Sequence, residues 1–490
     1  MSPMQPGFAS FRDPDGSVFS LAGRIFRSVT PSGAATLRAA LETPGVARMF
    51  SEGRIVATSP VDAEALGSAA SECRAAGQTE FFEHERIPFP SYPYEWPPEM
   101  LHAAAGLTID LARELLTSGF GIKDATPFNV LFRGPDPVFV DVLSFEARNP
   151  NDPIWLPYAQ FVRTFLLPLA LSKRLDLPID QVFQTRRDGI EPDEAYRWLP
   201  KSLRFRRPFL SLVTIPVWLA RRQNPDDAAF YRPRPMSDPE KARFVLDRLL
   251  ARLRRTVDRL QPATARPSAW SGYADANSYS PQAAAAKVAF VEQALAEFRP
   301  ARVLDLGANT GRFSELAAAQ GASVVAIDSD PVVVGALWRS ARAKGAGILP
   351  LVVDIARPTP AIGWRNRECP SFLERCQGHF DAVLMLALVH HLVVTERIPL
   401  AEVVALAADL TTDLAIVEFV GPEDPMFRRL LRGRERLYEG ITEPAFEVCV
   451  RERFEVVRRQ PLEGTARSIY LLRKRNLQAP YVGPQHLHAH

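Results

Sequence analysis

The spacing of apolar residues changes along the chain and separates two kinds of structure. Six apolar positions from Leu246 to Leu260 recur at helical spacing with arginines on the other face, which predicts an amphipathic helix. Residues 281–298 predict a second amphipathic helix, which Pro300 ends. From Arg302 onward, short apolar runs alternate with helical stretches. That alternation is typical of a parallel sheet with crossover helices.

The N-terminal half follows a different pattern, rich in proline, aromatic residues and turn signals. Short strands are predicted at residues 17–19 and 24–29, joined across Gly23 as a hairpin. The longest apolar run, residues 209–220, is broken by Pro216 and flanked by arginines. We expect this run to form a buried pair of helices with solvated ends. A segment that lies in a membrane interface is the alternative.

Composition narrows the class of protein. The 490 residues allow two to four domains, and 47% apolar with 23% charged residues is typical of a soluble folded chain. The formal net charge is only +3, so there is no strong nucleic-acid signal. Four scattered cysteines without C-x-x-C spacing predict neither disulfides nor a metal site. Without a secretory signal or an apolar run of roughly 18 residues, we expect a cytoplasmic protein with no transmembrane segment.

A glycine-rich turn follows the first strand of the C-terminal half. Residues 303–311 read VLDLGANTG, an apolar strand that runs into a turn and then into a helix. A second strand, residues 323–327, ends at Asp328, whose carboxylate can accept hydrogen bonds from ribose hydroxyls. Asp305, before the turn, suits a ligand with an ammonium group and would repel a pyrophosphate. These features predict a nucleoside cofactor site and disfavour the minor alternative, an NAD-dependent enzyme.

The D-x-G-x-x-x-G pattern of this turn resembles the first motif of class I S-adenosylmethionine-dependent methyltransferases, and the resemblance extends over about 170 residues. It implies an α/β fold with a Rossmann-like, seven-stranded methyltransferase sheet, and S-adenosyl-L-methionine as the cofactor. A closing antiparallel hairpin is implied at residues 454–457 and 468–472. In this pattern Asp354 faces the adenine, Asp328 holds the ribose, and Leu386 begins the segment that borders the transferring methyl group. The methionine end of the cofactor is then held by Asp305, Gly307, Asn309 and Gly311.

Side chains at later strand ends are candidates for acceptor chemistry. Histidine titrates near neutrality, so His390 or His391 can take a proton from a hydroxyl or amine that attacks the methyl group. The alternative is structural: one ring packs under the sheet and the other caps a helix. Many methyltransferases need no base, because orientation alone provides much of the rate. Glu418 and residues 421–430 are expected to line the acceptor side, unless the prolines there mark a purely structural loop.

A second motif lies in the N-terminal half. Asp124 precedes Asn129 by five residues, and a later strand delivers Asp141. This arrangement resembles the catalytic loop of protein kinases and aminoglycoside phosphotransferases. It implies a two-lobed α+β protein-kinase-like fold in which the first Asp orients a hydroxyl and the other two residues hold magnesium. No lysine precedes Lys123 to hold nucleotide phosphates, although Arg54 could replace one. We therefore expect a degenerate pseudokinase region, with an active phosphotransferase that uses ATP and Mg²⁺ as the alternative.

The segments KDATPFNVLF, VFVDVLSFE and EDPMFRRLL together resemble a poorly characterised, nodulation-protein-like family of bacterial methyltransferases. The resemblance implies methyltransferase activity and brings no substrate with it. We expect O- or N-methylation of an unidentified small-molecule, sugar or peptide acceptor. The N-terminal half would bind the substrate or regulate the enzyme, and the oligomeric state is left open. Five segments are expected: a kinase-like N-lobe at 1–100, its C-lobe at 101–235, a helical linker and lead-in helix at 236–300, the methyltransferase domain at 301–475 and a disordered tail at 476–490.

Overall fold

The computed structural model describes residues 13–222, 235–263 and 280–475. The tail expected at 476–490 lies outside these residues. The chain forms two compact units. The first contains Met1–Ala274, Asn309–Gly311 and Val325–Arg375, and the second contains Asp275–Ala308, Arg312–Val324 and Cys376–His490. The segment boundaries predicted from the sequence stay a prediction.

A four-stranded antiparallel sheet begins the first unit, with the strand order β1-β2-β4-β3. Its strands are β1 (Gly16–Leu21), β2 (Arg24–Val29), β3 (Thr58–Pro60) and β4 (Glu80–His84). Ala22 and Gly23 have φ angles of 50° and 79°, the positive values that a tight two-residue hairpin turn requires. The hairpin predicted across Gly23 is therefore confirmed. The rings of Phe19 and Phe26 stack 5.8 Å apart in a core shared with α3 (Ser68–Ala75).

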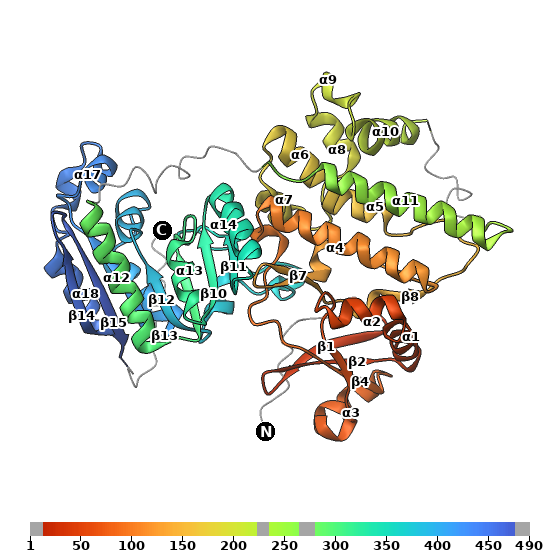
Figure 1. Cartoon of the computed structure of the whole chain (residues 1–490), viewed down its shortest axis with the longest axis horizontal. Helices are drawn as coiled ribbons and strands as arrows, with labels where there is room; N and C mark the ends of the chain where they lie inside the picture. The colour runs from red at the N-terminus through yellow and green to blue at the C-terminus, as the bar shows by residue number, and fades with distance from the viewer. Residues whose placement is uncertain (1–12, 223–234, 264–279, 476–490) are drawn as a thin grey trace, which may run out of the picture. The chain divides into compact units, whose positions relative to one another are not determined.

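Helices form most of the remaining N-terminal part of this unit (Figure 1). The long helix α4 (Pro98–Thr117) is largely buried and packs against α11 (Pro239–Arg259). The apolar face predicted for α11 is confirmed, because Leu246, Leu250 and Val257 are buried. The other helices are α1 (Pro31–Leu41), α2 (Pro44–Ser51), α5 (Tyr158–Phe161), α6 (Leu167–Leu175), α7 (Ile179–Thr185), α8 (Pro192–Trp198), α9 (Lys201–Arg204) and α10 (Ile215–Ala220). Four short strands pair as β5 (Phe120–Ile122) with β8 (Phe145–Ala147), and β6 (Val130–Arg133) with β7 (Asp136–Phe139).

The apolar run at residues 209–220 forms one continuous helical segment, so the expectation of a buried helix pair is wrong. A π-helical stretch, Leu210–Thr214, leads directly into α10. Ile215, Trp218 and Leu219 are exposed, because the segment buries only one of its faces. No helix in the described ranges is long and apolar enough to cross a membrane.

Seven strands of the C-terminal region form one sheet in the order β11-β10-β9-β12-β13-β15-β14. The strands are β9 (Arg302–Leu306), β10 (Ser323–Asp328), β11 (Ile348–Val352), β12 (Phe380–Met385), β13 (Thr411–Val420), β14 (Phe454–Leu462) and β15 (Arg467–Lys474). Strand β12 is parallel to both β9 and β13, whereas β15 is antiparallel to both β13 and β14. The seven-stranded sheet and its closing hairpin are therefore confirmed.

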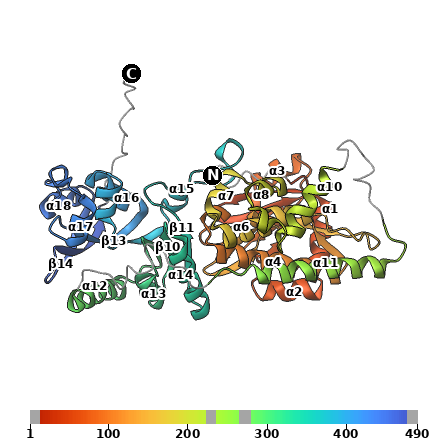
Figure 2. The same cartoon turned by 90° about the horizontal axis from the view of Figure 1, so that it is seen from above.

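Helices cover this sheet. They are α12 (Pro281–Phe298), α13 (Arg312–Ala319), α14 (Pro331–Lys344), α15 (Phe372–Cys376), α16 (Leu400–Leu410), α17 (Pro425–Leu431) and α18 (Glu443–Arg453). Within the second unit, α12 and α13 lie on one face of the sheet and α16 and α18 on the other (Figure 2). The strands are consequently buried on both sides, which explains their nearly continuous apolar sequences.

Within the first unit, the N-terminal part packs against the segment Val325–Arg375. The indole of Trp338 on α14 donates a hydrogen bond of 3.0 Å to the carbonyl of Pro135. The fully buried carboxylate of Glu95 pairs with Arg375. Strands β10 and β11 are therefore anchored to the N-terminal part of the unit.

Candidate active site

The turn after β9 requires glycine. Gly307 and Gly311 have φ angles of 71° and 86°, which L side chains rarely adopt. A Cβ atom on Gly311 would also overlap the side chain of Leu337. Asn309 takes a φ of 52°, a conformation that asparagine tolerates better than most residues. The two glycines therefore allow a backbone shape that residues with side chains would adopt only under strain.

Asp328 and Asp354 lie at neighbouring strand ends in the first unit. The amide of Val353 donates to the carbonyl of Asp328 at 3.0 Å, which joins the ends of β10 and β11. The Asp328 carboxylate accepts hydrogen bonds of 3.0 Å from the amides of Asn309 and Asp330. Burial raises the pKa of this carboxyl. The structure therefore brings Asn309, Asp328 and Asp354 together.

The second unit holds the other predicted cofactor residues. The buried carboxylate of Asp305 accepts a hydrogen bond of 2.6 Å from the hydroxyl of Ser314 on α13. At the end of β12, Leu386 is buried and Ala387 has a φ of 55°. The Ala387 amide donates to Glu418 Oε2 at 2.9 Å, so the ends of β12 and β13 are tied to each other.

Glu418 belongs to a buried charge cluster of Lys287, Glu418, Asp424 and Arg467, here named the Glu418 cluster. Lys287 Nζ lies 2.6 Å from Glu418 Oε2, and Arg467 Nη1 lies 3.4 Å from Oε1. Arg467 Nε also lies 2.7 Å from Asp424 Oδ2. Glu418 is therefore neutralised by internal partners, whereas the sequence had suggested a residue that faces the acceptor. Sequence reasoning missed Lys287, although its position on the apolar face of α12 was a readable signal.

His390 and His391 follow β12, and their rings lie 4.2 Å apart. His390 is fully buried, and neither of its ring nitrogens has a hydrogen-bond partner in the described part of the chain. Burial, helped by His391 and Arg467, lowers the pKa of His390 well below its usual value. Burial and the charge of Arg467 lower the pKa of His391 to about 4. Both imidazoles are therefore neutral at physiological pH.

The N-terminal motif is also brought together. The Asn129 side-chain amide donates to the backbone carbonyl of Asp124 at 3.1 Å, and Gln160 donates to the Asp124 carboxylate at 3.3 Å. The β6–β7 hairpin returns the chain so that the Val140 amide donates to the Asn129 carbonyl at 2.9 Å. Asp141 therefore lies beside the loop that carries Asp124 and Asn129.

The arginine that faces Asp141 is Arg27 on β2, with Nη1 and Oδ1 3.2 Å apart. Arg54, the substitute for a phosphate-binding lysine suggested by the sequence, instead pairs with Asp110 at 2.9 Å. Burial raises the pKa of Asp141, and Arg27 opposes that rise. Arg27 is only 6% exposed, and the sequence of β2, which also contains Arg24 and Ser28, did not single it out.

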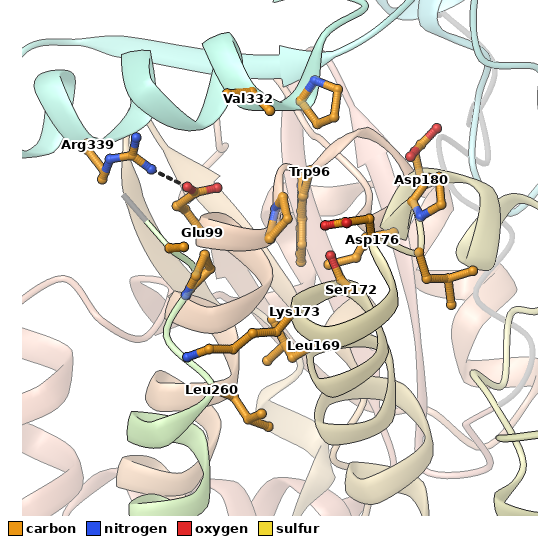
Figure 3. A pocket seen from close by; sticks show the side chains of 17 residues that line it. Trp96, Glu99, Leu169, Ser172, Lys173, Asp176, Asp180, Leu260, Val332 and Arg339 are labelled. Carbon is orange, nitrogen blue, oxygen red and sulfur yellow. Dashed lines mark hydrogen bonds and ion pairs between the residues drawn. The ribbon is translucent and has the colours of Figure 1, made fainter. Parts of the chain in front are cut away.

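A separate cavity of about 110 Å³ lies in the first unit, between α4, α6 and the start of α14 (Figure 3). Trp96, Asp176 and Val332 line it, and the ion pair of Glu99 with Arg339 lies at its edge. It is smaller than the roughly 300 Å³ of a typical ligand pocket. None of the predicted cofactor residues lines it, so it is distinct from the site at the strand ends.

The chain is similar to several known proteins. Residues 277–424 match a family described as a methyltransferase domain. The nodulation protein NoeA of Rhizobium meliloti (strain 1021) is 31% identical over 465 residues, which is 94% of each chain. Magnesium protoporphyrin IX methyltransferase from Synechocystis PCC 6803 with bound SAH is 18% identical, covering 39% of this chain and 84% of its own, with a TM-score of 0.29. The bifunctional kinase-methyltransferase WbdD is 21% identical, covering 41% of each chain, with a TM-score of 0.27.

Proposed function

The chain belongs to the family of the nodulation protein NoeA and is an S-adenosylmethionine-dependent methyltransferase, and we propose that it methylates an oxygen or nitrogen of an acceptor that its N-terminal part helps to bind. The observation that carries the cofactor assignment is the hydrogen bond from the Asn309 amide to the Asp328 carboxylate. It fixes the glycine turn against a carboxylate that can still accept hydrogen bonds through its other lone pairs.

Each cofactor residue has a role in this proposal. Asp328 accepts hydrogen bonds from the ribose hydroxyls, Asp354 faces the adenine amino group, and the buried Asp305 attracts the ammonium group. The backbone of Gly307, Asn309 and Gly311 lets the methionine end approach, because the two glycines add no side chain there, and Leu386 borders the methyl group. Parallel strands bind ligands at their carboxyl ends, where these residues lie. When bound, the cofactor supplies an electrophilic sulfonium methyl group.

His391 is the proposed proton acceptor. It is less buried than His390, and its neutral imidazole keeps a lone pair that can take a proton from a hydroxyl or amine. Protonated His391 would be repelled by the charge of Arg467. His391 must therefore release the proton to solvent soon after accepting it. His390, which is fully buried, is proposed to position His391 through their ring contact.

For the N-terminal part we propose a kinase-like fold that binds the acceptor and does not transfer phosphate. Arg27 already neutralises the Asp141 carboxylate, which would otherwise hold Mg²⁺. The loop nevertheless keeps Asp124 and Asn129 in hydrogen-bonded order. That order favours an ATP-dependent phosphotransferase as the second candidate function. A thermal shift with ATP and Mg²⁺ that Asp141→Ala abolishes would support it, and no shift with any nucleotide would count against it.

Calorimetric titration with S-adenosylmethionine tests the main proposal. Asp328→Ala should weaken binding at least about tenfold, because a hydrogen bond from a hydroxyl to a charged group contributes about 1.5–3 kcal/mol. Asp381→Ala is the matched control, since that carboxylate pairs with Arg302 at the opposite ends of β12 and β9. Unchanged affinity in the Asp328 variant would show that the cofactor residues are wrongly assigned.

A second measurement addresses the acceptor role of the N-terminal part. Asp124→Asn should leave cofactor affinity unchanged and reduce transfer of radiolabelled methyl groups to a bacterial extract. Turnover equal to that of the unmodified chain would remove Asp124 from acceptor binding.

A further inference from the structure

An exposed apolar surface lies on the last N-terminal helices of the first unit. Figure 1 shows α8, α9 and α10 grouped together, and contacts among α8, α9, α10 and the π-helical stretch before α10 agree with this grouping. The rings of Phe205 and Trp218 contact each other at 6.0 Å. Five large apolar side chains, which we call the α10 patch, are each between 41% and 59% exposed: Trp198, Phe205, Ile215, Trp218 and Leu219. Such a concentration of exposed aromatic and aliphatic side chains marks an interaction surface.

The α10 patch is embedded in positive charge. Residues 195–222 contain no Asp or Glu, although the whole chain has a net charge of only +3. Their seven basic residues are Arg197, Lys201, Arg204, Arg206, Arg207, Arg221 and Arg222. Arg204 and Arg221 stack on Tyr196, at 4.0 Å and 5.3 Å from its ring centroid, which holds them beside the patch. The neighbouring Asp193 compensates only part of this charge, through Arg197 and Arg221.

We propose that the α10 patch binds the surface of an anionic lipid bilayer. Tryptophan, phenylalanine and leucine side chains enter the boundary between headgroups and acyl chains, and arginines beside them pair with lipid phosphates. A second copy of this chain would bring two strongly positive surfaces together. The continuous helical segment at residues 209–220 is shorter than the roughly 18 residues that a membrane span requires, so it lies in the interface and does not cross it.

Vesicle flotation of the full chain tests this proposal. Binding should be strong to vesicles that contain phosphatidylglycerol, weak to phosphatidylcholine alone, and reduced by added salt. Replacing two exposed arginines, Arg206→Gln with Arg207→Gln, should lower the partition coefficient about thirtyfold, because each basic residue contributes about fivefold at an anionic surface. Trp218→Glu should abolish binding, and Leu219→Glu provides a second variant should Trp218→Glu lower the thermal midpoint.

Trp364→Glu is the matched control, because Trp364 is 65% exposed and also lies beside arginines, outside the patch. It should bind vesicles as the unmodified chain does. The proposal is overturned if the unmodified chain does not float with phosphatidylglycerol vesicles, or if the Trp218 and Trp364 variants lose binding equally. It is also overturned if Trp218→Glu changes only the oligomeric state, which would identify the patch as a self-association surface.

Discussion

The hydrogen-bond chain through His84 makes the stability of the N-terminal part depend on pH. Arg27 Nε is a donor only, so the His84 Nε2 atom 3.2 Å away must carry the lone pair. The proton then lies on Nδ1, which donates to the Thr58 hydroxyl at 2.9 Å, and Thr58 donates to the Val56 carbonyl. Protonation of Nε2 would place an N–H group against Arg27. Burial, with this opposing charge, lowers the pKa of His84 to about 3.

The sign and size of the effect follow from linkage. Above the ordinary histidine pKa of 6.5, the ring is neutral in both the folded and the unfolded chain. As the pH falls below 6.5, His84 binds a proton in the unfolded chain and stays neutral in the folded chain. Folding stability is therefore lost until the pH reaches the pKa of His84 in the folded chain. Each pH unit in this range costs about 1.4 kcal/mol, so near pH 4.5 the loss is roughly 2.7 kcal/mol.

His84→Gln removes the titration and keeps a side chain that can both accept from Arg27 and donate to Thr58. Urea unfolding would be followed for the unmodified chain and the variant at about pH 7.5 and about pH 4.5. The unmodified chain should lose roughly 2.7 kcal/mol more than the variant between these two conditions. Parallel losses in both proteins would refute the neutral state of His84 in the folded chain.

Three further predictions concern the C-terminal region. Gly311→Ala should lower the free energy of unfolding by about 2–4 kcal/mol, through strain at positive φ and overlap with Leu337, and should weaken cofactor binding in calorimetry. Glu418→Gln should cost about 3–5 kcal/mol by leaving buried cations uncompensated, and adding Lys287→Met should recover part of that loss in chemical denaturation. His391→Gln should slow methyl transfer; in the unmodified enzyme the rate should stay level from neutrality down to about pH 5 and fall as His391 is protonated. A variant with the same rate and the same acid limb would exclude His391 as the proton acceptor.

The parts of the fold that were predictable depend on local pattern. Periodicity or turn chemistry within a few residues was enough to predict three elements. They are the helix at Leu246–Leu260, the hairpin at Gly23 and the strand that ends at Asp328. The pairing of the buried charges was not predictable in this way. Lys287 and Glu418 are 131 positions apart, and only tertiary packing decides that a lysine on α12 meets a carboxylate on β13.

The same limit explains the choice between Arg27 and Arg54. Both arginines precede the kinase-like loop, and the sequence offers no measure of which one reaches Asp141. Sheet pairing places Arg27 on the inner strand β2, next to β4. This pairing determines that Arg27 is the arginine that reaches Asp141. The partial exposure of residues 209–220 could not be predicted for a related reason. An apolar run does not reveal how much of its surface other elements cover.

The anchoring of Val325–Arg375 to the N-terminal part constrains how such a protein can be inherited. A gene fragment that began at residue 277, where the methyltransferase match starts, would encode a Trp338 indole without its Pro135 acceptor and an Arg375 without Glu95. Without the N-terminal part these contacts would be lost, and the apolar surface that they cover would be exposed to water. Recombination at the boundary between the two sequence halves should therefore yield proteins that fold poorly. We expect the gene to be transferred between genomes as a whole.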